Sequence, residues 1–411
     1  MPLPTHLLKE LLKDLLKLSC MKLLQDMQSI ELLLEFSIRH IQLQHERNNR
    51  KCSIQHNDRI RWSHIKIRLS DNQFKRMYRM SKGCFESLCE KIILAVGPDE
   101  FKSEEYLDQV YKECEDHYLI AHQIRNNGLV CGEIKLAVTL RLLAGASYLD
   151  LLLLYGISYQ HIYTIFHYVN KEWICHNDVT NISFHNDLQD ENSMEATAKQ
   201  FANGTSHGII SGCIGAVDGW LVRIKCPSHS RDGIKNPGAY YSRKGFYAFN
   251  IQIIADKNKM ILWKSALHKG AQHDSPAFQT SNLYEQLQNK MEWLLEKKYY
   301  LIGDSAYSIR SFLLVPYDRS TPGSKEDGFN YHLSACRIYV ECTFGALYNR
   351  WGILWRPLLF SLQHNVVVID SVCRLHNFNI KYDMGHNIDP DETVNIFGKE
   401  IINNLNSSKS N

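Results

Sequence analysis

Two short apolar runs in the second half of the chain each stop on an aspartate that lies beside a glycine. They are CIGAVD at residues 213–218 and YYLIGD at residues 299–304. Short runs rich in branched and aromatic side chains predict buried strands. Alternation along the first strand places Ile214, Ala216 and Asp218 on one face of the sheet. A carboxylate at the end of a core strand costs free energy unless its charge is compensated, so these aspartates constrain both the fold and its chemistry.

Further strands and one helix are predicted around these two runs. FYAFNIQIIAD at 246–256 and KMILWKSAL at 259–267 have the composition of strands, and SPAFQTSNLYEQLQNKMEWLLEK at 275–297 has that of a helix. Three strands, a helix and a fourth strand predict a mixed α/β sheet. A polar segment at 176–205 precedes this region and is interpreted as a linker leading into a helix.

The first half of the chain is predicted to be helical. Residues 1–68 comprise a Leu-rich amphipathic helix and a polar, basic linker, and the helix is expected to pack on its own domain or on a partner helix. No apolar stretch is long enough to span a bilayer, so no membrane association is expected. Residues 1–80 contain 15 Lys and Arg against 8 Asp and Glu, whereas the whole chain has a net charge of +3. The basic N-terminal region allows a nucleic-acid partner without proving one.

Residues 69–175 are predicted to form an all-α domain. Its last three helical pieces are about 133–144, 147–154 and 158–171. A helix, a short turn and a helix that opens on Ser158 are typical of a helix-turn-helix. A compact three-helix bundle without a role in DNA binding explains the same pattern equally well.

The twelve cysteines are scattered along the chain, and none belongs to a CxxC pair. In a chain of 411 residues this distribution indicates reduced thiols rather than a disulfide framework or a zinc knuckle. Any metal site is therefore expected to use other ligands.

A third acid, Glu341, is predicted on a helix. In SACRIYVECTFGALYNRW the apolar positions recur at helical spacing, and Glu341 lies at the edge of that apolar stripe. Neighbouring carboxylates repel, and a divalent cation such as Mg²⁺ compensates both the repulsion and the burial. Two such ions about 4 Å apart can activate water and stabilise the leaving oxygen in phosphodiester cleavage. The residues alone favour structural roles at least as well: Asp304 as a turn former or helix cap, and Glu341 as the partner of Arg337.

Six short motifs occur in a fixed order along the chain. They are GAVDG at 215–219, YYSRKG at 240–245, HDS at 273–275, GDSAY at 303–307, RIYVECTFGALYNRWGIL at 337–354 and LHN at 375–377. In this order and spacing they resemble the PIF/Harbinger transposases and their domesticated relatives, the Harbinger-derived nucleases. The resemblance covers about residues 69–382. One departure is that Trp220 and Leu221 stand where the family often has Thr-His.

The resemblance implies an RNase H-like, mixed-sheet catalytic domain of the DDE type over residues 206–385, followed by a flexible tail at 386–411. It assigns the catalytic and metal-ligating roles to Asp218, Asp304 and Glu341, with two Mg²⁺ or Mn²⁺ ions in the site. Asp274, in the HDS motif, is interpreted as supporting the site rather than as ligating the metal.

Basic residues near the motifs are candidates for DNA contact. They are Arg223, Lys225, Arg243, Lys244, Arg337 and Arg350. Cations of this kind neutralise phosphates, and the aromatic residues between the first four can stack on bases. The alternatives are a solvated basic loop for the first four, and bracing of the last helix for Arg337 and Arg350.

The predicted function is that of a metal-dependent endonuclease or transposase that cleaves DNA phosphodiesters. The alternative is a domesticated DNA-binding or adaptor protein that has the fold but does not cleave. The resemblance also implies work in the nucleus, with the cytoplasm as a second location, and a Myb-like DNA-binding partner protein. The residues leave open the oligomeric state and the DNA sequence recognised.

Overall fold

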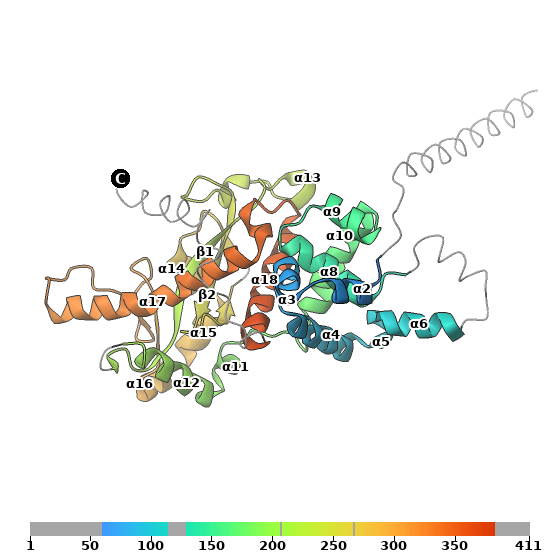
Figure 1. The fold of residues 1–411 in the computed structure, drawn as a ribbon. Helices are drawn as coiled ribbons and strands as arrows, with labels where there is room; N and C mark the ends of the chain where they lie inside the picture. Colours follow the sequence, from blue (N-terminus) through green and yellow to red (C-terminus); the bar gives the residue numbers. More distant parts are fainter. Residues whose placement is uncertain (1–59, 114–128, 206–207, 266–267, 383–411) are drawn as a thin grey trace, which may run out of the picture. The chain divides into compact units, whose positions relative to one another are not determined.

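The computed structural model describes residues 60–113, 129–205, 208–265 and 268–382 (Figure 1). The predicted Leu-rich helix and the predicted tail at 386–411 lie outside these ranges. The described residues all belong to one compact unit, and the predicted boundaries at 175 and 206 fall inside it. Among the described residues, no helix combines the length and the apolar character that crossing a membrane requires.

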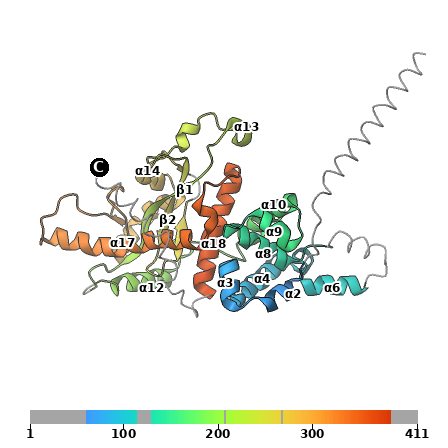
Figure 2. The ribbon, with the colours of Figure 1, turned by 45° about the horizontal axis from the view of Figure 1, so that its top comes forward.

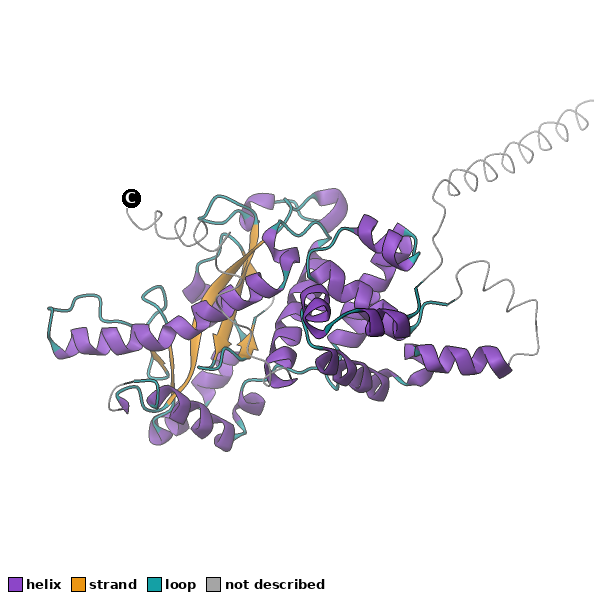
Figure 3. Cartoon of the chain, in the orientation of Figure 1, coloured by secondary structure: helices purple, strands orange, loops and turns teal. Residues whose placement is uncertain are grey.

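A mixed sheet lies at the centre of the C-terminal half, with helices around it (Figure 3). Its strands are β1 Cys213–Arg223, β2 Ala248–Ala255, β3 Ile261–Lys264, β4 His268–Lys269, β5 Tyr300–Ile302 and β6 Leu313–Leu314. They are ordered β3-β2-β1-β5-β6, with β4 also pairing with β2. β1 is antiparallel to β2 and parallel to β5, which is parallel to β6. The predicted mixed sheet is confirmed, and its strand order is consistent with an RNase H-like fold.

Two details of the strand predictions were wrong. β1 does not end at Asp218 but continues to Arg223, because the antiparallel partner β2 runs along its whole second half. Ile214 and Ala216 lie in different core clusters on the two faces of the sheet, because the register shifts between Cys213 and Ala216. Simple alternation therefore fails at the start of the strand, although it holds from Ala216 onward.

Helices cover both faces of the sheet. They are α12 Glu191–Ala202, α14 Asp274–Gln279, α15 Asn282–Asn289, α16 Met291–Lys297, α17 Lys325–Arg350 and α18 Leu362–Tyr382. On one face Trp220, Ile251 and Ile253 pack with Val340 and Leu347 of α17. The opposite face shares its core with α14, α15 and α16. The single helix predicted over 275–297 is thus three short helices, and β6 was not predicted.

The N-terminal part of the described chain is helical, as predicted. Its helices are α2 Trp62–Arg68, α3 Asp71–Tyr78, α4 Lys82–Val96, α5 Pro98–Phe101, α6 Glu104–Glu113, α8 Gly132–Leu143, α9 Tyr148–Tyr155 and α10 Tyr159–Tyr168, with a π-helix η1 at Val169–Ile174. The Ser158 side chain accepts a hydrogen bond from His161 N and begins α10. The three helices predicted over 133–171 are therefore present, whereas their role as a DNA-reading helix-turn-helix stays a prediction.

Two segments interpreted as linkers contain helices that bury apolar side chains. Trp62 and Ile65 of α2 lie in the helical core. In the segment 176–205, α11 (His185–Leu188) and α12 pack with the sheet, and Met194 of α12 is fully buried. The prediction that 176–205 leads into a helix is confirmed by α12. The segment also packs on the sheet, because the polar residues of α12 mark only its exposed face.

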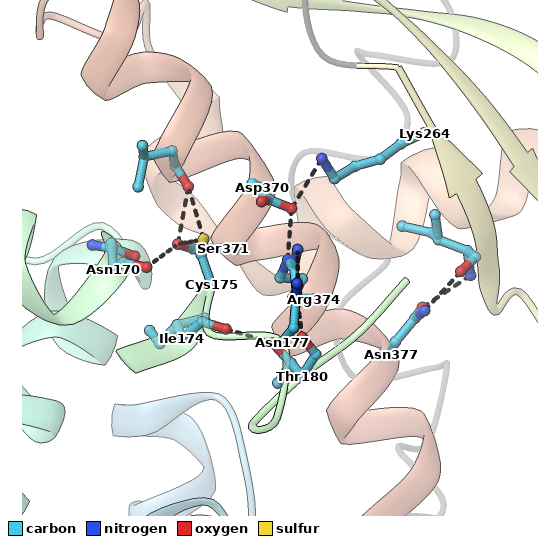
Figure 4. Close-up of polar contacts among 12 residues, drawn as sticks. Asn170, Ile174, Cys175, Asn177, Thr180, Lys264, Asp370, Ser371, Arg374 and Asn377 are labelled. Carbon is cyan, nitrogen blue, oxygen red and sulfur yellow. Dashed lines mark hydrogen bonds and ion pairs between the residues drawn. The ribbon is translucent and has the colours of Figure 1, made fainter. Parts of the chain in front are cut away.

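The helix α18 connects the helical part to the sheet and lies between them in two views (Figures 1 and 2). Figure 4 shows its polar contacts. Asp370 accepts from Lys264 of β3 and from Arg374, both at 2.9 Å, and Arg374 donates to the Thr180 carbonyl. Asn377, in the LHN motif, accepts from Ile261 N at 2.9 Å and donates to Ile261 O at 2.7 Å. Its amide replaces a neighbouring strand at the edge of the sheet.

Candidate active site

The first two predicted triad residues reach the same level of the sheet. β1 and β5 are parallel neighbours, and Ala216 lies opposite Ile302. Asp218 and Asp304 each lie two residues beyond that pair. Because parallel strands run in the same direction, the two carboxylates are brought to the same level, just beyond the end of β5. Their electrostatic interaction contributes to the raised pKa of Asp218.

Asp218 is a partly buried acid with few partners. Its Oδ1 accepts from Gly219 N at 2.8 Å, and its Oδ2 accepts from Arg337 Nη1 at 3.2 Å. Burial raises its pKa to about 7; Arg337 opposes this rise, whereas the neighbouring Asp304 and Asp274 add to it. The site therefore concentrates more negative charge than its own cations compensate.

Asp304 occupies a turn after β5. Its Oδ1 accepts from Ala306 N at 3.0 Å, so the structural role as a turn former is present. No helix begins at this turn, and the alternative role as a helix cap was wrong. Burial raises the pKa of Asp304, and Arg337 and Arg243 act against that rise. The second carboxylate oxygen is not used by the turn.

Glu341 lies on α17 and pairs with Arg337, one turn earlier. The alternative prediction of an i, i+4 ion pair is thus confirmed. The same guanidinium also donates to Asp218, so Arg337 lies between two of the three predicted metal ligands. The Glu341 side chain is about half exposed, at 48%.

The helix α17 is fixed to β1 by aromatic packing beside Asp218. Trp220 stacks on Phe344, with ring centroids 6.0 Å apart and planes at 11°, and meets Tyr348 edge to face. Trp220 replaces a residue common in the family, and here it sets the position of the helix that bears Arg337 and Glu341. α17 begins at Lys325, much earlier than the motif that predicted it.

The donor chemistry of the site fits a hard divalent cation. Asp218 and Asp304 are partly buried oxygen donors that repel each other, and Mg²⁺ or Mn²⁺ takes such ligands. Within the described ranges, no three Asp, Glu, His or Cys side chains converge as they would around a bound ion. Arg337 instead supplies the positive charge between Asp218 and Glu341.

A buried polar network on the opposite face links the two aspartate-bearing segments. Asp274 Oδ1 accepts from Asn250 Nδ2 at 2.9 Å and from Gln252 Nε2 at 3.2 Å. Gln252 in turn accepts from the hydroxyl of Tyr307, three residues after Asp304. A Cβ on Gly219 would lie 2.0 Å from Asp274 Oδ1, so only glycine allows Asp274 to approach β1 there.

Sequence reasoning predicted the supporting role of Asp274 but missed Asn250, Gln252 and Tyr307. A signal for the first two was present, since they are the only polar residues in the run AFNIQIIA and are two positions apart. Polar residues at spacing two in a fully buried strand indicate a shared polar contact on one face.

The predicted DNA-contacting residues divide into two sets. Arg223, Lys225, Arg243 and Lys244 are all exposed. Arg243 Nη2 lies 3.4 Å from Asp274 Oδ2, and Arg243 and Lys244 line a small polar pocket with Gly219. Arg223 lies over the Phe246 ring, with 4.5 Å between its Cζ and the ring centroid.

Arg350 is partly buried at the other end of α17 and acts electrostatically on the buried His376. This position agrees with the bracing role that was the alternative for Arg350. Arg337, the other arginine of α17, faces the acids of the site.

Comparison with known proteins agrees with this geometry. Residues 217–377 match the family described as "DDE superfamily endonuclease". "Putative nuclease HARBI1" of Bos taurus is 28% identical over 201 residues, covering 47% of this chain and 53% of the relative. These matches support a Harbinger-type, DDE transposase-derived origin for this part of the chain. The Xenopus laevis relative of the same name is 26% identical over 200 residues, or 48% of this chain and 53% of its own.

The match is confined to part of each protein. "Protein ALP1-like" of Arabidopsis thaliana is 23% identical over 187 residues, covering 41% of this chain and 43% of the relative. The chain spans about half the length of the HARBI1 proteins it matches. No solved structure matches this Harbinger-type chain. The family match contains all three predicted triad residues and the LHN motif, but not the helical region upstream of the sheet.

Proposed function

We propose that the chain is a divalent-metal-dependent DNA endonuclease of the transposase type. The observation that supports this most directly is the register of β1 and β5, which brings Asp218 and Asp304 to the same level of the sheet. Their partial burial and their mutual repulsion are costly, and two perturbed acids side by side are typical of a functional site. Glu341 on the neighbouring helix completes the set.

In this proposal Asp218, Asp304 and Glu341 would hold Mg²⁺ or Mn²⁺. When bound, the ions would neutralise charge on the phosphate and lower the pKa of the attacking water. Asp304 is oriented by the backbone of its turn, and Asp218 by Gly219 N. The network of Asp274, Gln252 and Tyr307 keeps the two segments in register.

The DNA would lie over the exposed basic residues that follow β1. Arg243 and Lys244 are joined to the acid cluster through the pocket that includes Asp274. Arg223 and Lys225 extend this positive surface at the end of β1. Their charges would contact phosphates and would carry no sequence preference. Work in the nucleus and a Myb-like partner protein belong to the same proposal.

One observation favours the alternative of a domesticated adaptor protein that binds DNA without cleaving it. Arg337 pairs with both Asp218 and Glu341, so part of the acid cluster is compensated without a metal. The two functions differ in one respect only, which is whether metal-dependent cleavage occurs.

The deciding experiment measures nicking of supercoiled duplex DNA by the full chain with Mg²⁺ or Mn²⁺. Asp304→Asn removes a proposed ligand, and Asp256→Asn is the matched control. Asp256 is a buried acid after β2 that accepts from Met260 N, and asparagine can replace that bond. We expect nicking by the wild type and by Asp256→Asn but not by Asp304→Asn.

Absence of cleavage by the wild type, with DNA binding retained in the presence of a Myb-like partner protein, would support the adaptor function. Equal nicking by Asp304→Asn and the wild type would contradict the proposed site.

A further inference from the structure

We propose that Arg337 is a built-in counter-cation that occupies the metal position between Asp218 and Glu341 and must leave it before a divalent ion binds. This inference rests on the proposed function, because it assigns the same carboxylates to the metal. It adds a property that the triad alone does not have, since a side chain of the protein competes with the metal and sets its affinity.

The geometry of Arg337 is that of a bridge. Its Nη1 lies 3.2 Å from Asp218 Oδ2, and its Nη2 pairs with Glu341 Oε1. A planar guanidinium with separate donors can serve two carboxylates at once. The Arg337 side chain is only 20% exposed, so this is a partly buried contact and not a solvated surface pair.

The same oxygens cannot serve both cations. A divalent ion takes carboxylate oxygens at about 2.0 to 2.6 Å, which leaves no room for a guanidinium at hydrogen-bond distance from the same atoms. The two cations would also repel each other. Binding of the ion and the Arg337 bridge are therefore mutually exclusive.

Arg337 can leave without moving the helix. α17 is anchored by the stack of Trp220 on Phe344 and by the buried Val340 and Leu347. The guanidinium lies at the end of a long unbranched chain, and Glu341 lies one turn further along the same helix. Rotation of the Arg337 side chain therefore exposes both carboxylates while Glu341 stays in place.

Arg243 provides an internal comparison. It also acts on Asp304 and pairs with a carboxylate at the site, but that carboxylate is Asp274, and Arg243 is 61% exposed. Arg243 therefore contributes positive charge nearby without lying between the proposed ligands. Removing either arginine changes the net charge by one, and only Arg337 blocks the oxygens.

The test measures Mn²⁺ binding by the full chain without DNA, from the loss of the free-Mn²⁺ signal in electron paramagnetic resonance. In the wild type, Mn²⁺ can bind only those molecules in which Arg337 has left the carboxylates. The apparent affinity for Mn²⁺ is therefore the intrinsic affinity multiplied by the fraction of such molecules. We expect Arg337→Gln to bind Mn²⁺ about tenfold more tightly than the wild type, because glutamine does not compete with the ion for the carboxylates. A tenfold change is of the size typical of coupling between two ligands. Arg243→Gln should change the affinity by less than about twofold, because its charge is exposed and screened. Arg337→Lys should fall between the wild type and Arg337→Gln, since lysine lacks the planar fork.

A second readout is the Mn²⁺-induced rise in melting temperature, which grows with affinity for the folded chain. We expect a larger rise in Arg337→Gln than in the wild type at equal Mn²⁺ concentration. If Arg337→Gln does not fold without metal, Arg337→Lys decides the question by the same two measurements.

Equal or weaker Mn²⁺ binding by the Arg337 variants would overturn the inference, and so would equal tightening by Arg243→Gln, which would show a general charge effect. Mn²⁺ binding of unchanged affinity would leave the proposed function standing. Failure of every variant and of the wild type to bind Mn²⁺ would overturn both.

Discussion

Two partly buried acids in this molecule have basic partners, and they differ in how completely those partners compensate their charge. Asp370 on α18 has two cations, Lys264 and Arg374. Asp218 on β1 has one, Arg337, which it shares with Glu341 while two other aspartates lie nearby. Burial acts to raise the pKa of both acids. For Asp370 the two cations outweigh the effect of burial and lower the pKa. For Asp218 the single cation does not, and the pKa is raised to about 7.

This difference indicates a structural role for Asp370 and a chemical role for Asp218. The polar cluster of α18 is compensated, and it connects β3 to the helical part of the chain (Figure 4). The acid cluster at the end of β5 is compensated only in part, by Arg337, and an incomplete charge balance in a rigid sheet is what a cation-binding site requires. Four measurements test this difference between the two acids and the elements that hold them.

The largest effect is expected for Asp218→Asn. Nicking should fall at least about a thousandfold, since a proposed ligand is removed. The folded chain should keep its stability or gain some, because a buried charge with a raised pKa is replaced by a neutral side chain of equal size. Nicking assays and urea unfolding on the same preparation measure both. If stability were lost together with activity, Asp218 would stabilise the fold as Asp370 does, and the comparison would fail.

Asp370→Asn should show the reverse pattern. Removing this acid leaves Lys264 and Arg374 partly buried without their partner, and we expect a loss of about 3 kcal/mol in the free energy of unfolding. Nicking by the fraction that remains folded should be unchanged. Urea unfolding measures the loss, with Glu195→Gln as a control that removes an exposed pair with Lys199 and should have no measurable effect.

The helix α18 should also respond to pH through His376. Burial lowers its pKa to about 4, its Nε2 lies 2.8 Å from the Lys259 carbonyl, and the unfolded chain titrates near 6.5. Between these values the unfolded state binds more protons, so stability is present above about pH 6.5 and is lost as the pH falls toward 4.

We expect His376 to contribute a loss of about 2 kcal/mol between pH 7 and pH 5. Urea unfolding at several pH values, compared with His376→Gln, isolates this contribution. The comparison is needed because burial raises the pKa of Asp256 to about 6, which gives the opposite dependence between about pH 4 and 6. An identical pH dependence in His376→Gln and the wild type would contradict the assignment.

The smallest effect is expected for Tyr307→Phe. It removes the hydroxyl that donates to Gln252 and so loosens the network behind the acids. Nicking should fall about tenfold, as is usual when a group that orients metal ligands is lost. Tyr284→Phe is the matched control, because it removes a hydroxyl in the same core that accepts only from Arg310. Equal effects of the two changes would make the network merely structural.

The amino-acid sequence was enough to predict most of the secondary structure around the site. Apolar runs predicted β1, β2, β3 and β5, helical spacing predicted the helices upstream, and the aspartates were placed at the correct strands. These features depend on neighbours a few residues apart, whose side chains alternate with the period of a strand or a helix. The family followed from the order of the motifs.

The contacts of those residues depend on tertiary packing. Asp218 and Arg337 are 119 positions apart, and Gln252 and Tyr307 are 55 apart. The polar residues of α12 suggested a linker, and only packing against β1 shows that Met194 is buried. Pairing across such distances depends on strand register and on the seating of α17 over Trp220, and no local period encodes either one. The sequence thus determined the acids of the site, and the fold determined that an arginine lies between two of them.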